Sequence, residues 1–120
     1  MTSTPTDSPA SAYEGRTVLV TGGAGAIGSN LTAALLAAGA SVVVLDSMTA
    51  GYRWNLPRHD QLLVVEADIL DETALKRVFA ERPAVVFHLA AFFANQNSVD
   101  YPERDLMVNG LGTLRLLEYA

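Results

Sequence analysis

The sequence predicts an α/β domain built on a doubly wound parallel sheet, on three observations. Four short apolar runs rich in valine recur along the 120 residues, and helical patterns follow the first and the third. The runs are continuously apolar instead of alternating, which is typical of strands buried on both faces. Strands that alternate with helices imply right-handed crossovers between parallel strands. The predicted strands are residues 17–21, 41–46, 61–66 and 84–89.

The first connection predicts a helix over residues 27–38. Its apolar positions recur at helical spacing, and Gly39 supplies a stop signal. The predicted apolar face consists of Ile27, Leu31, Leu35 and Ala38. The second connection, 47–60, contains Gly51 and Pro57 and is predicted to be loop more than helix.

The third connection predicts a helix over residues 71–81. Asp71 is a plausible N-cap, and Pro83 is expected to end the helix. An apolar stripe at helical spacing marks its buried face, and it consists of Leu75, Val78 and Phe79.

The last part of the chain predicts an irregular loop over residues 90–101 and then a helix that runs from near Pro102 to the end. The helix has apolar residues at helical spacing, namely Leu106, Met107, Leu111, Leu114 and Leu117. Gly110 and Gly112 each cost roughly 1 kcal/mol in a helix relative to alanine. They predict that another backbone or helix approaches this helix closely.

A glycine-rich turn joins the first strand to the first helix. Gly22, Gly25 and Gly28 fit Gly-x-x-Gly-x-x-Gly, and Gly23 with the last two fits Gly-x-Gly-x-x-Gly. Such a turn presents backbone N–H groups at a helix N-terminus, where the helix dipole favours a pyrophosphate. Asp46 ends the second strand eighteen residues after Gly28, where its carboxylate can accept hydrogen bonds from an adenosine ribose. The pattern predicts a dinucleotide site. The alternative is a tight turn without a ligand.

The same pattern predicts Rossmann topology and a preference for NAD. The strand order for this part of the fold is 3-2-1-4, so residues 22–28 and 88–93 would line one crevice at the switch point. The carboxylate of Asp46 repels the extra phosphate of NADP and therefore favours NAD, unless it only caps the strand end. Arg53 is either a partner for a 2′-phosphate or a solvated surface charge.

Composition narrows the class of protein. Half of the residues are hydrophobic and the net charge is −5, so a globular domain is favoured and a nucleic-acid partner is not. Without cysteine, and with His59 and His88 outside metal-ligand spacing, no metal site is predicted. No apolar stretch approaches the ~18–20 residues that span a bilayer. Residues 1–14 are interpreted as a flexible Thr/Ser/Pro-rich tail without secretory-signal features, and a cytoplasmic location is expected.

Several separated motifs carry a resemblance to a known family. They are Thr21-Gly22-Gly23-Ala24-Gly25-Ala26-Ile27-Gly28, the segment 45–51, Asp68-Ile69, His88-Leu89-Ala90-Ala91 and Asn109-Gly110-x-Gly112-Thr113. In this order they resemble the N-terminal part of the extended short-chain dehydrogenase/reductase family, in its NAD-dependent nucleotide-sugar epimerase and dehydratase branch. The resemblance covers residues 15–120. It implies an NAD-binding Rossmann domain that lacks the C-terminal strands and the substrate domain.

The resemblance implies a set of cofactor-binding residues: Gly22, Gly25, Ala26, Ile27, Gly28, Asp46, Ser47, Asp68, Ile69, Leu89, Ala90, Ala91 and Asn109. It places three residues on the substrate side, namely Phe93, Gln96 and Ser98, and Phe93 could equally belong to the core. Asp68 could instead stabilise a turn, and Asn109 could belong to an exposed polar face. Ala26 departs from the family, which often has an aromatic residue there. A nucleotide sugar as substrate and a homodimer are implied by the resemblance alone.

The catalytic residues of the family have no counterpart in these residues. The family transfers a hydride transiently at a sugar carbon with the help of a Tyr-x-x-x-Lys pair. Lys76 is the only lysine, and none of Tyr13, Tyr52, Tyr101 and Tyr119 has a lysine four places later. We therefore expect no catalytic residue in this chain and no activity from it alone. The alternative is a non-catalytic dinucleotide-binding module or truncated pseudoenzyme.

Overall fold

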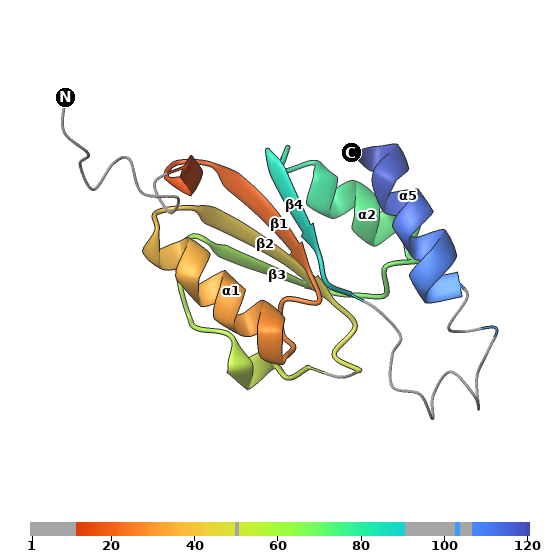
Figure 1. Ribbon diagram of the computed structural model, residues 1–120, viewed down its shortest axis with the longest axis horizontal. Coiled ribbons are helices and arrows are strands. Elements are labelled where there is room, and N and C mark those ends of the chain that lie inside the picture. The colour runs from red at the N-terminus through yellow and green to blue at the C-terminus, as the bar shows by residue number, and fades with distance from the viewer. Residues whose placement is uncertain (1–11, 50, 91–102, 104–106) are drawn as a thin grey trace.

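The computed structural model describes residues 12–49, 51–90, 103 and 107–120, and its centre is a parallel sheet of four strands. The strands are β1 (Thr17–Thr21), β2 (Ser41–Asp46), β3 (Leu62–Glu66) and β4 (Val85–His88). Their order across the sheet is β3-β2-β1-β4, and every neighbouring pair is parallel. The predicted fold class and strand order are therefore confirmed (Figure 1).

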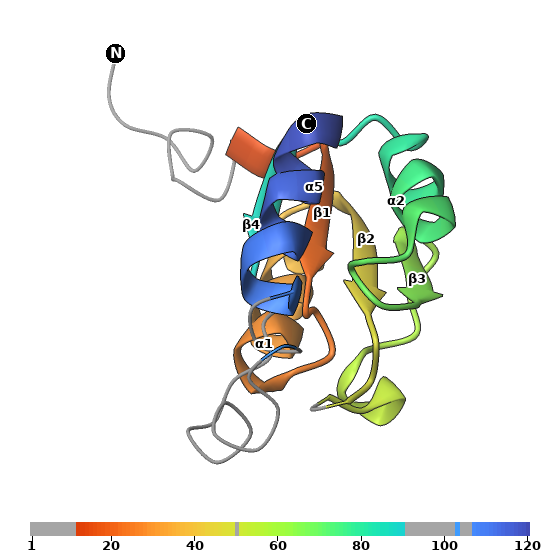
Figure 2. The ribbon, with the colours of Figure 1, turned by 90° about the vertical axis from the view of Figure 1, so that its right-hand side faces the viewer.

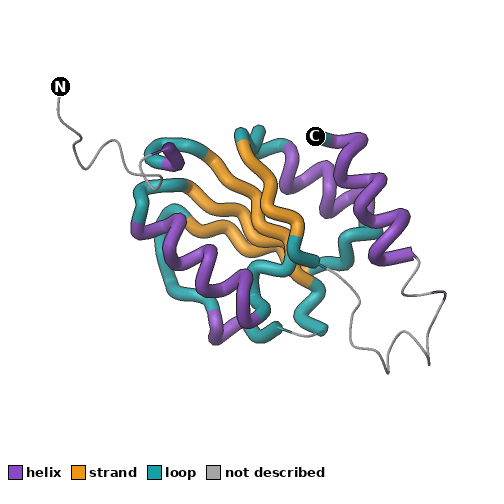
Figure 3. Tube along the Cα trace, in the orientation of Figure 1, coloured by secondary structure: helices purple, strands orange, loops and turns teal. Residues whose placement is uncertain are grey.

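Helices cover both faces of the sheet. Helix α1 (Ala26–Ala37) lies on one face, and α2 (Glu72–Phe79) and α5 (Gly112–Tyr119) lie together on the other (Figures 1 and 2). A 3₁₀ turn, η3 (Arg53–Asn55), interrupts the loop after β2, and a π-helical turn, η4 (Met107–Leu111), leads into α5. Figure 3 shows the resulting helix–sheet–helix sandwich. No helix within the described residues is long and apolar enough to cross a membrane.

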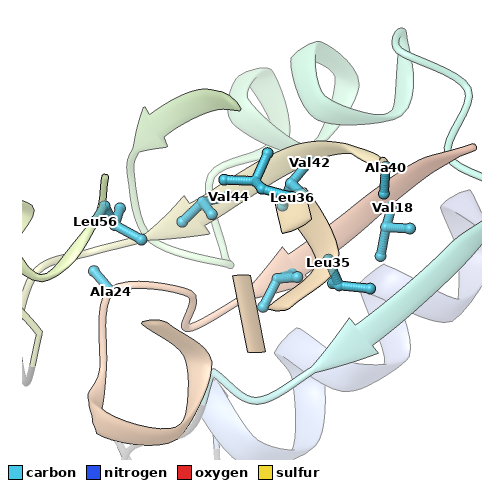
Figure 4. Packing of buried hydrophobic residues seen from close by; sticks show 9 residues of the cluster. Val18, Ala24, Leu35, Leu36, Ala40, Val42, Val44 and Leu56 are labelled. Atoms are coloured by element: carbon cyan, nitrogen blue, oxygen red, sulfur yellow. The ribbon is translucent and has the colours of Figure 1, made fainter. Parts of the chain in front are cut away.

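The alternation of side chains along the strands divides the core into two clusters. On the α1 face, Val18 and Val44 are fully buried and pack with Leu35 of α1 (Figure 4). On the opposite face, Leu19 of β1 packs with Leu75 of α2, in the cluster that also contains Leu116 of α5. Both central strands are therefore apolar on both faces, which explains their continuous apolar runs.

The two edge strands are less buried than their sequence predicts. Every residue of β1 after Thr17 and of β2 after Ser41 is buried. The strands β3 and β4 are only half-buried, and Glu66 is exposed. Within the described part of the chain each of these strands has a single neighbour in the sheet, so one side of it is not covered by another strand. The prediction of full burial is correct for the centre of the sheet and wrong for its edges.

The buried face of α1 differs from the predicted one. The buried residues are Gly28, Thr32, Leu35 and Leu36, whereas Ile27 is 76% exposed. Gly28 faces inward and allows the first turn of α1 to approach the backbone of the glycine-rich turn, while the neighbouring Ile27 lies on the exposed side. The predicted stripe is therefore wrong at Ile27 and correct at Leu35.

The C-terminal helix also packs through a face other than the predicted one. Its buried residues are Gly112 and Leu116, while Met107, Leu114 and Leu117 are exposed. A Cβ atom on Gly112 would lie 2.8 Å from Cγ2 of Ile69, so this glycine makes room for the side chain of Ile69 and not for another backbone. Gly112 and Leu116 are four residues apart and share one side of the helix, and Leu116 packs in the cluster formed by the sheet and α2. Leu106 lies outside the described residues.

Helix α2 follows its prediction most closely. Oδ1 of Asp71 accepts a hydrogen bond from the backbone N of Ala74 at 3.2 Å, so the predicted N-cap is confirmed. Leu75 and Val78 are buried as predicted. The helix ends at Phe79, two residues before the predicted end at residue 81. At the other end of the described chain, Tyr13 contacts Phe87 with ring centroids 6.0 Å apart.

Candidate dinucleotide site at the carboxyl edge of the sheet

The glycine-rich turn is held between the ends of three strands. Gly22 has a φ of 73°, which favours glycine, and its N–H donates to the carbonyl of Leu45 at 2.8 Å. A Cβ atom on Gly22 would lie 2.8 Å from the N of Ala90 and 2.9 Å from the carbonyl carbon of Leu89. The turn therefore contacts the end of β4, as the predicted switch point requires.

Two further glycines are required by the protein's own packing. A Cβ atom on Gly28 would overlap the carbonyl oxygen of Gly22 and lie 2.8 Å from Cα of Gly23. A Cβ atom on Gly23 would lie 2.7 Å from a methyl group of Val44. These glycines let α1 pack closely on the strand ends, and the folded chain explains both without a ligand.

Gly25 is different, because the folded chain leaves room beside it. The nearest atom to a Cβ built there is the carbonyl oxygen of Gly22 at 3.5 Å, an ordinary contact, and its φ of −75° suits any residue. Gly25 is the N-cap of α1, but it has no side chain with which to cap the helix, and the first turn contains no acidic residue. The first amides of a helix have no acceptor within the helix. Ala26 and Ile27 are both exposed at this end, so their amides can face an anion.

Asp46 is oriented by two backbone amides. Its Oδ2 accepts from the N–H of Ala24 at 2.9 Å, and its Oδ1 accepts from the N–H of Met48 at 2.7 Å. The residue is only 8% exposed. A carboxylate offers about four acceptor positions, so these two bonds leave capacity for two hydroxyl groups. The carboxylate is held beside the glycine-rich turn at the end of β2.

The peptide of Ala24 connects this turn to the loop after β2. Its carbonyl accepts from the N–H of Tyr52 at 3.2 Å and from Nδ2 of Asn55 at 2.9 Å. A Cβ atom on Gly51 would lie 2.6 Å from the carbonyl carbon of Ala24, so this glycine is also required. Sequence reasoning missed this role of Asn55, because no local pattern reveals a contact to a residue 31 positions away.

The aromatic residues of the same loop pair with each other. Tyr52 and Trp54 stack with ring centroids 4.4 Å apart and remain exposed. The stack accounts for Trp54, which the sequence leaves unexplained. Arg53 between them is exposed, as expected of a solvated charge. Ser47 is also exposed, and its hydroxyl lies 2.8 Å from that of Thr49.

The segment after β3 has a clear structural role. Oδ1 of Asp68 accepts from the N–H of Leu70 at 2.9 Å, and its carbonyl accepts from the N–H of Asp71 at 2.9 Å. Asp68 therefore stabilises a turn, which is one of its two predicted roles. Ile69 is buried beneath Gly112 of α5. Contact of this segment with an adenine remains a prediction.

His88, at the end of β4, bridges the sheet and the C-terminal helix. Its Nδ1 lies 2.7 Å from Oγ1 of Thr21, and its Nε2 lies 2.9 Å from Oγ1 of Thr113. Oγ1 of Thr21 accepts from the N–H of Ala90 at 3.1 Å. Burial lowers the pKa of His88 from its ordinary value, so the neutral ring is favoured.

The structure thus brings the predicted glycines, the start of α1, Asp46 and the Leu89–Ala90 backbone to one edge of the sheet. Four predicted residues lie outside the described residues: Ala91, Phe93, Gln96 and Ser98. Asn109 lies in η4, and its carbonyl accepts from the hydroxyl of Thr113 at 2.8 Å. Across the described part of the chain, no three acidic or histidine side chains are grouped as metal ligands.

Comparisons with known proteins agree with this geometry. The model of the NAD dependent epimerase/dehydratase family matches residues 18–120. UDP-glucose 4-epimerase of Mycolicibacterium smegmatis is 45% identical over 105 residues, which cover 85% of this chain and 34% of that protein. Among solved structures, the epimerase Mth375 of Methanothermobacter thermautotrophicus has a TM-score of 0.90 at 61% identity, covering 92% of this chain and 33% of that one. UDP-glucose 4-epimerase of Thermus thermophilus, in complex with NAD, has a TM-score of 0.79 at 44% identity. The match covers 86% of this chain and 33% of that one. The chain spans about a third of the length of these relatives.

Proposed function

The chain belongs to the NAD-dependent epimerase/dehydratase family, and on that premise we propose that it forms the NAD-binding part of a nucleotide-sugar epimerase or dehydratase. One observation carries the proposal. Gly25 leaves open space at an uncapped helix N-terminus, and Asp46 is held beside the same turn. Room for a side chain that glycine does not have, next to helix amides that lack an acceptor within the helix, is what a pyrophosphate needs.

Each part of the site has a role in this proposal. The amides at the start of α1 bind the pyrophosphate, and Gly25 keeps the approach clear. Asp46 accepts the hydroxyls of the adenosine ribose, and its negative charge disfavours a 2′-phosphate. The backbone of Leu89 and Ala90 borders the opposite side of the crevice, because it contacts Gly22.

The bound NAD supplies the hydride acceptor, and these residues hold it in place. No tyrosine of the chain has a lysine four positions later, so we propose that proton transfer depends on residues outside this sequence. The nucleotide sugar as substrate is proposed from the relatives. One of them, from Thermotoga maritima, is a UDP-glucose 4-epimerase in a structure with UDP-glucose.

The test is titration of cofactor-free protein with NAD, with Gly25→Val as the diagnostic variant. Valine at this position would occupy the space of the pyrophosphate, so we expect NAD binding to fall below detection while the circular dichroism spectrum stays unchanged. Ala33→Val is the matched control, because it enlarges an exposed residue of the same helix away from the turn. Undiminished NAD affinity in Gly25→Val would overturn the proposed site.

A second candidate is a dinucleotide-binding module without catalysis. These residues carry the cofactor motifs without a Tyr-x-x-x-Lys pair, as such a module would. One experiment on the natural gene product distinguishes the two functions, by measuring NAD binding and the conversion of UDP-glucose. NAD binding with conversion of the sugar supports the enzyme. NAD binding without conversion of UDP-glucose or of related nucleotide sugars supports the module.

We also propose a homodimer, supported by the exposed leucines of the C-terminal helix. Leu114 and Leu117 lie three residues apart on the side of α5 that does not face α2. Light scattering on the natural gene product should give twice the mass of one chain. The double variant Leu114→Glu, Leu117→Glu should reduce the mass to that of a monomer, and an unchanged mass would refute this interface.

A further inference from the structure

A continuous line of hydrogen bonds passes through His88 from the sheet to the C-terminal helix. It joins the N–H of Ala90 to Oγ1 of Thr21, that hydroxyl to Nδ1 of His88, and Nε2 of His88 to Oγ1 of Thr113. The last link runs from the hydroxyl of Thr113 to the carbonyl of Asn109. The line connects β1, β4, η4 and α5.

The donors and acceptors of this line can be assigned by counting protons. The single hydroxyl proton of Thr113 is donated to the carbonyl of Asn109, so its oxygen must accept the proton on Nε2 of His88. The neutral ring then has no proton on Nδ1, which accepts from the hydroxyl of Thr21. The oxygen of Thr21 accepts in turn from the N–H of Ala90. Every link of the line therefore runs in one direction, and each donor in it meets an acceptor.

The line of hydrogen bonds ends at Ala90, beside the glycine-rich turn, and at Asn109, in the turn before α5. Ala90 and Leu89 form the backbone against which Gly22 packs, with less than 3 Å to a Cβ atom built on that glycine. Asn109 lies in the π-helical turn η4, and such turns occur frequently at functional sites. The hydrogen bonds of His88 thus fix the C-terminal helix relative to the cofactor side of the sheet.

We propose that His88 and Thr113 are positioning residues of the dinucleotide crevice. They hold the Leu89–Ala90 backbone and the π-helical turn in the arrangement that the bound cofactor requires. This inference rests on the proposed function, because the crevice is the proposed NAD site. Neither residue needs to touch the reacting atoms, and no proton has to move along the line.

The first test does not depend on NAD. In ¹⁵N-resolved NMR spectra, His88 should be the Nε2–H tautomer, with a proton on Nε2 that exchanges slowly with water. Thr113→Val removes the acceptor and should accelerate this exchange at least tenfold. Thr113→Ser keeps a hydroxyl and should restore slow exchange. An Nδ1–H tautomer in the unmodified protein would overturn the assignment.

The second test measures NAD affinity in the same variants. Thr113→Val should weaken NAD binding about tenfold, in line with loss of the part-buried bond to His88 and the exposed bond to the carbonyl of Asn109. Thr113→Ser should bind within about twofold of the unmodified protein. Thr32→Val is the matched control, since Thr32 is a fully buried threonine whose hydroxyl has no partner among the described residues, and it should leave NAD affinity unchanged.

A double variant tests whether the two residues act through one link. In His88→Asn, the amide oxygen can take the place of Nδ1 and keep the bond to Thr21, while the bond to Thr113 is lost. The double variant with Thr113→Val should therefore bind NAD no more weakly than either single variant. Additive losses would contradict a shared link.

The outcomes distinguish this inference from the proposed function. NAD binding by the unmodified protein with no loss in Thr113→Val refutes the positioning role and leaves the proposed function intact. No NAD binding by the unmodified protein refutes both, and the exchange measurement then shows whether the line of hydrogen bonds is purely structural. His88→Asn provides an independent reading should Thr113→Val fail to fold.

Discussion

At the scale of single residues, glycines that look equivalent in the sequence have different reasons to be there. Position 22 requires glycine because its φ is positive and because a Cβ atom there would collide with the end of β4. Position 28 requires glycine because a Cβ atom there would overlap the carbonyl oxygen of Gly22. Gly25 is the member of the motif that neither backbone conformation nor packing requires. The N-cap position favours glycine over alanine, and the proposed pyrophosphate would use the room that glycine leaves.

Two alanine substitutions separate these reasons. Gly28→Ala should lower the free energy of unfolding by about 2 kcal/mol, because its Cβ overlaps the carbonyl of Gly22. Gly25→Ala should lower that free energy by no more than about 1 kcal/mol, because its Cβ meets only an ordinary contact and the cost is the loss of a favourable N-cap residue. Urea unfolding measures both. Equal destabilisation by the two variants would show that Gly25 is also required by packing.

His88 should make stability depend on pH. Its pKa is lowered in the fold by burial, so between that value and the ordinary value near 6.5 the unfolded chain binds more protons. Its contribution to stability is present above about pH 6.5 and is lost as the pH falls through the folded value. His88→Asn should remove this part of the dependence in urea unfolding at a series of pH values.

The other histidine serves as the control for that series. His59 is exposed, so His59→Asn should leave the pH dependence of the unmodified protein in place. The same pH dependence in His88→Asn as in the unmodified protein would mean that His88 is not its source.

At the scale of elements, the sequence predicts where helices and strands lie better than which face they bury. Composition and capping locate α2 and its buried residues, because that helix has one apolar side and a clear N-cap. The apolar spacing of α1 and α5 fails at Ile27, Leu114 and Leu117, which are all exposed. Hydrophobic spacing cannot distinguish a side chain that faces the core from one that faces a ligand or another chain.

The corrected face of α5 gives a prediction on two neighbouring leucines. Leu116 is 4% exposed and Leu117 is 67% exposed. Leu116→Ala should lower the free energy of unfolding by about 2–5 kcal/mol, since it leaves a cavity between α5 and α2. Leu117→Ala should change it by less than about 0.5 kcal/mol. The reverse order in urea unfolding would contradict the packing of this helix.

The sequence predicts the local motifs of the candidate site, but it does not predict the long-range contacts that hold them in place. The glycine-rich turn and Asp46 follow from spacing, and the structure places them together through the bond from Ala24 to Asp46. The contacts of Asn55 and His88 span 31 and 25 residues and depend on how loops fold back. No periodicity in the sequence encodes them.

At the scale of the whole molecule, β4 forms one edge of the sheet that the structure describes. Among the described residues β4 pairs only with β1, and a groove of about 480 Å³ lies beside it. Its lining includes Phe79, Val86 and Tyr119. An unpaired strand edge beside apolar side chains favours association with another chain.

This open edge predicts the behaviour of the 120-residue chain by itself. We expect it to self-associate, so that light scattering shows a mass rising with concentration. Ala84→Lys places a charge on an exposed residue beside the start of the edge strand and should reduce the association. A monodisperse, stable monomer over the same concentrations would show that the edge is protected.

The central claim is that the start of α1 and Asp46 together bind NAD. Calorimetric titration of the cofactor-free protein with NAD and with NADP tests it most directly. We predict one NAD site per chain and at least tenfold weaker binding of NADP, because in the proposed site the carboxylate of Asp46 would repel the extra phosphate. No binding of NAD, or equal binding of the two dinucleotides, would contradict this account.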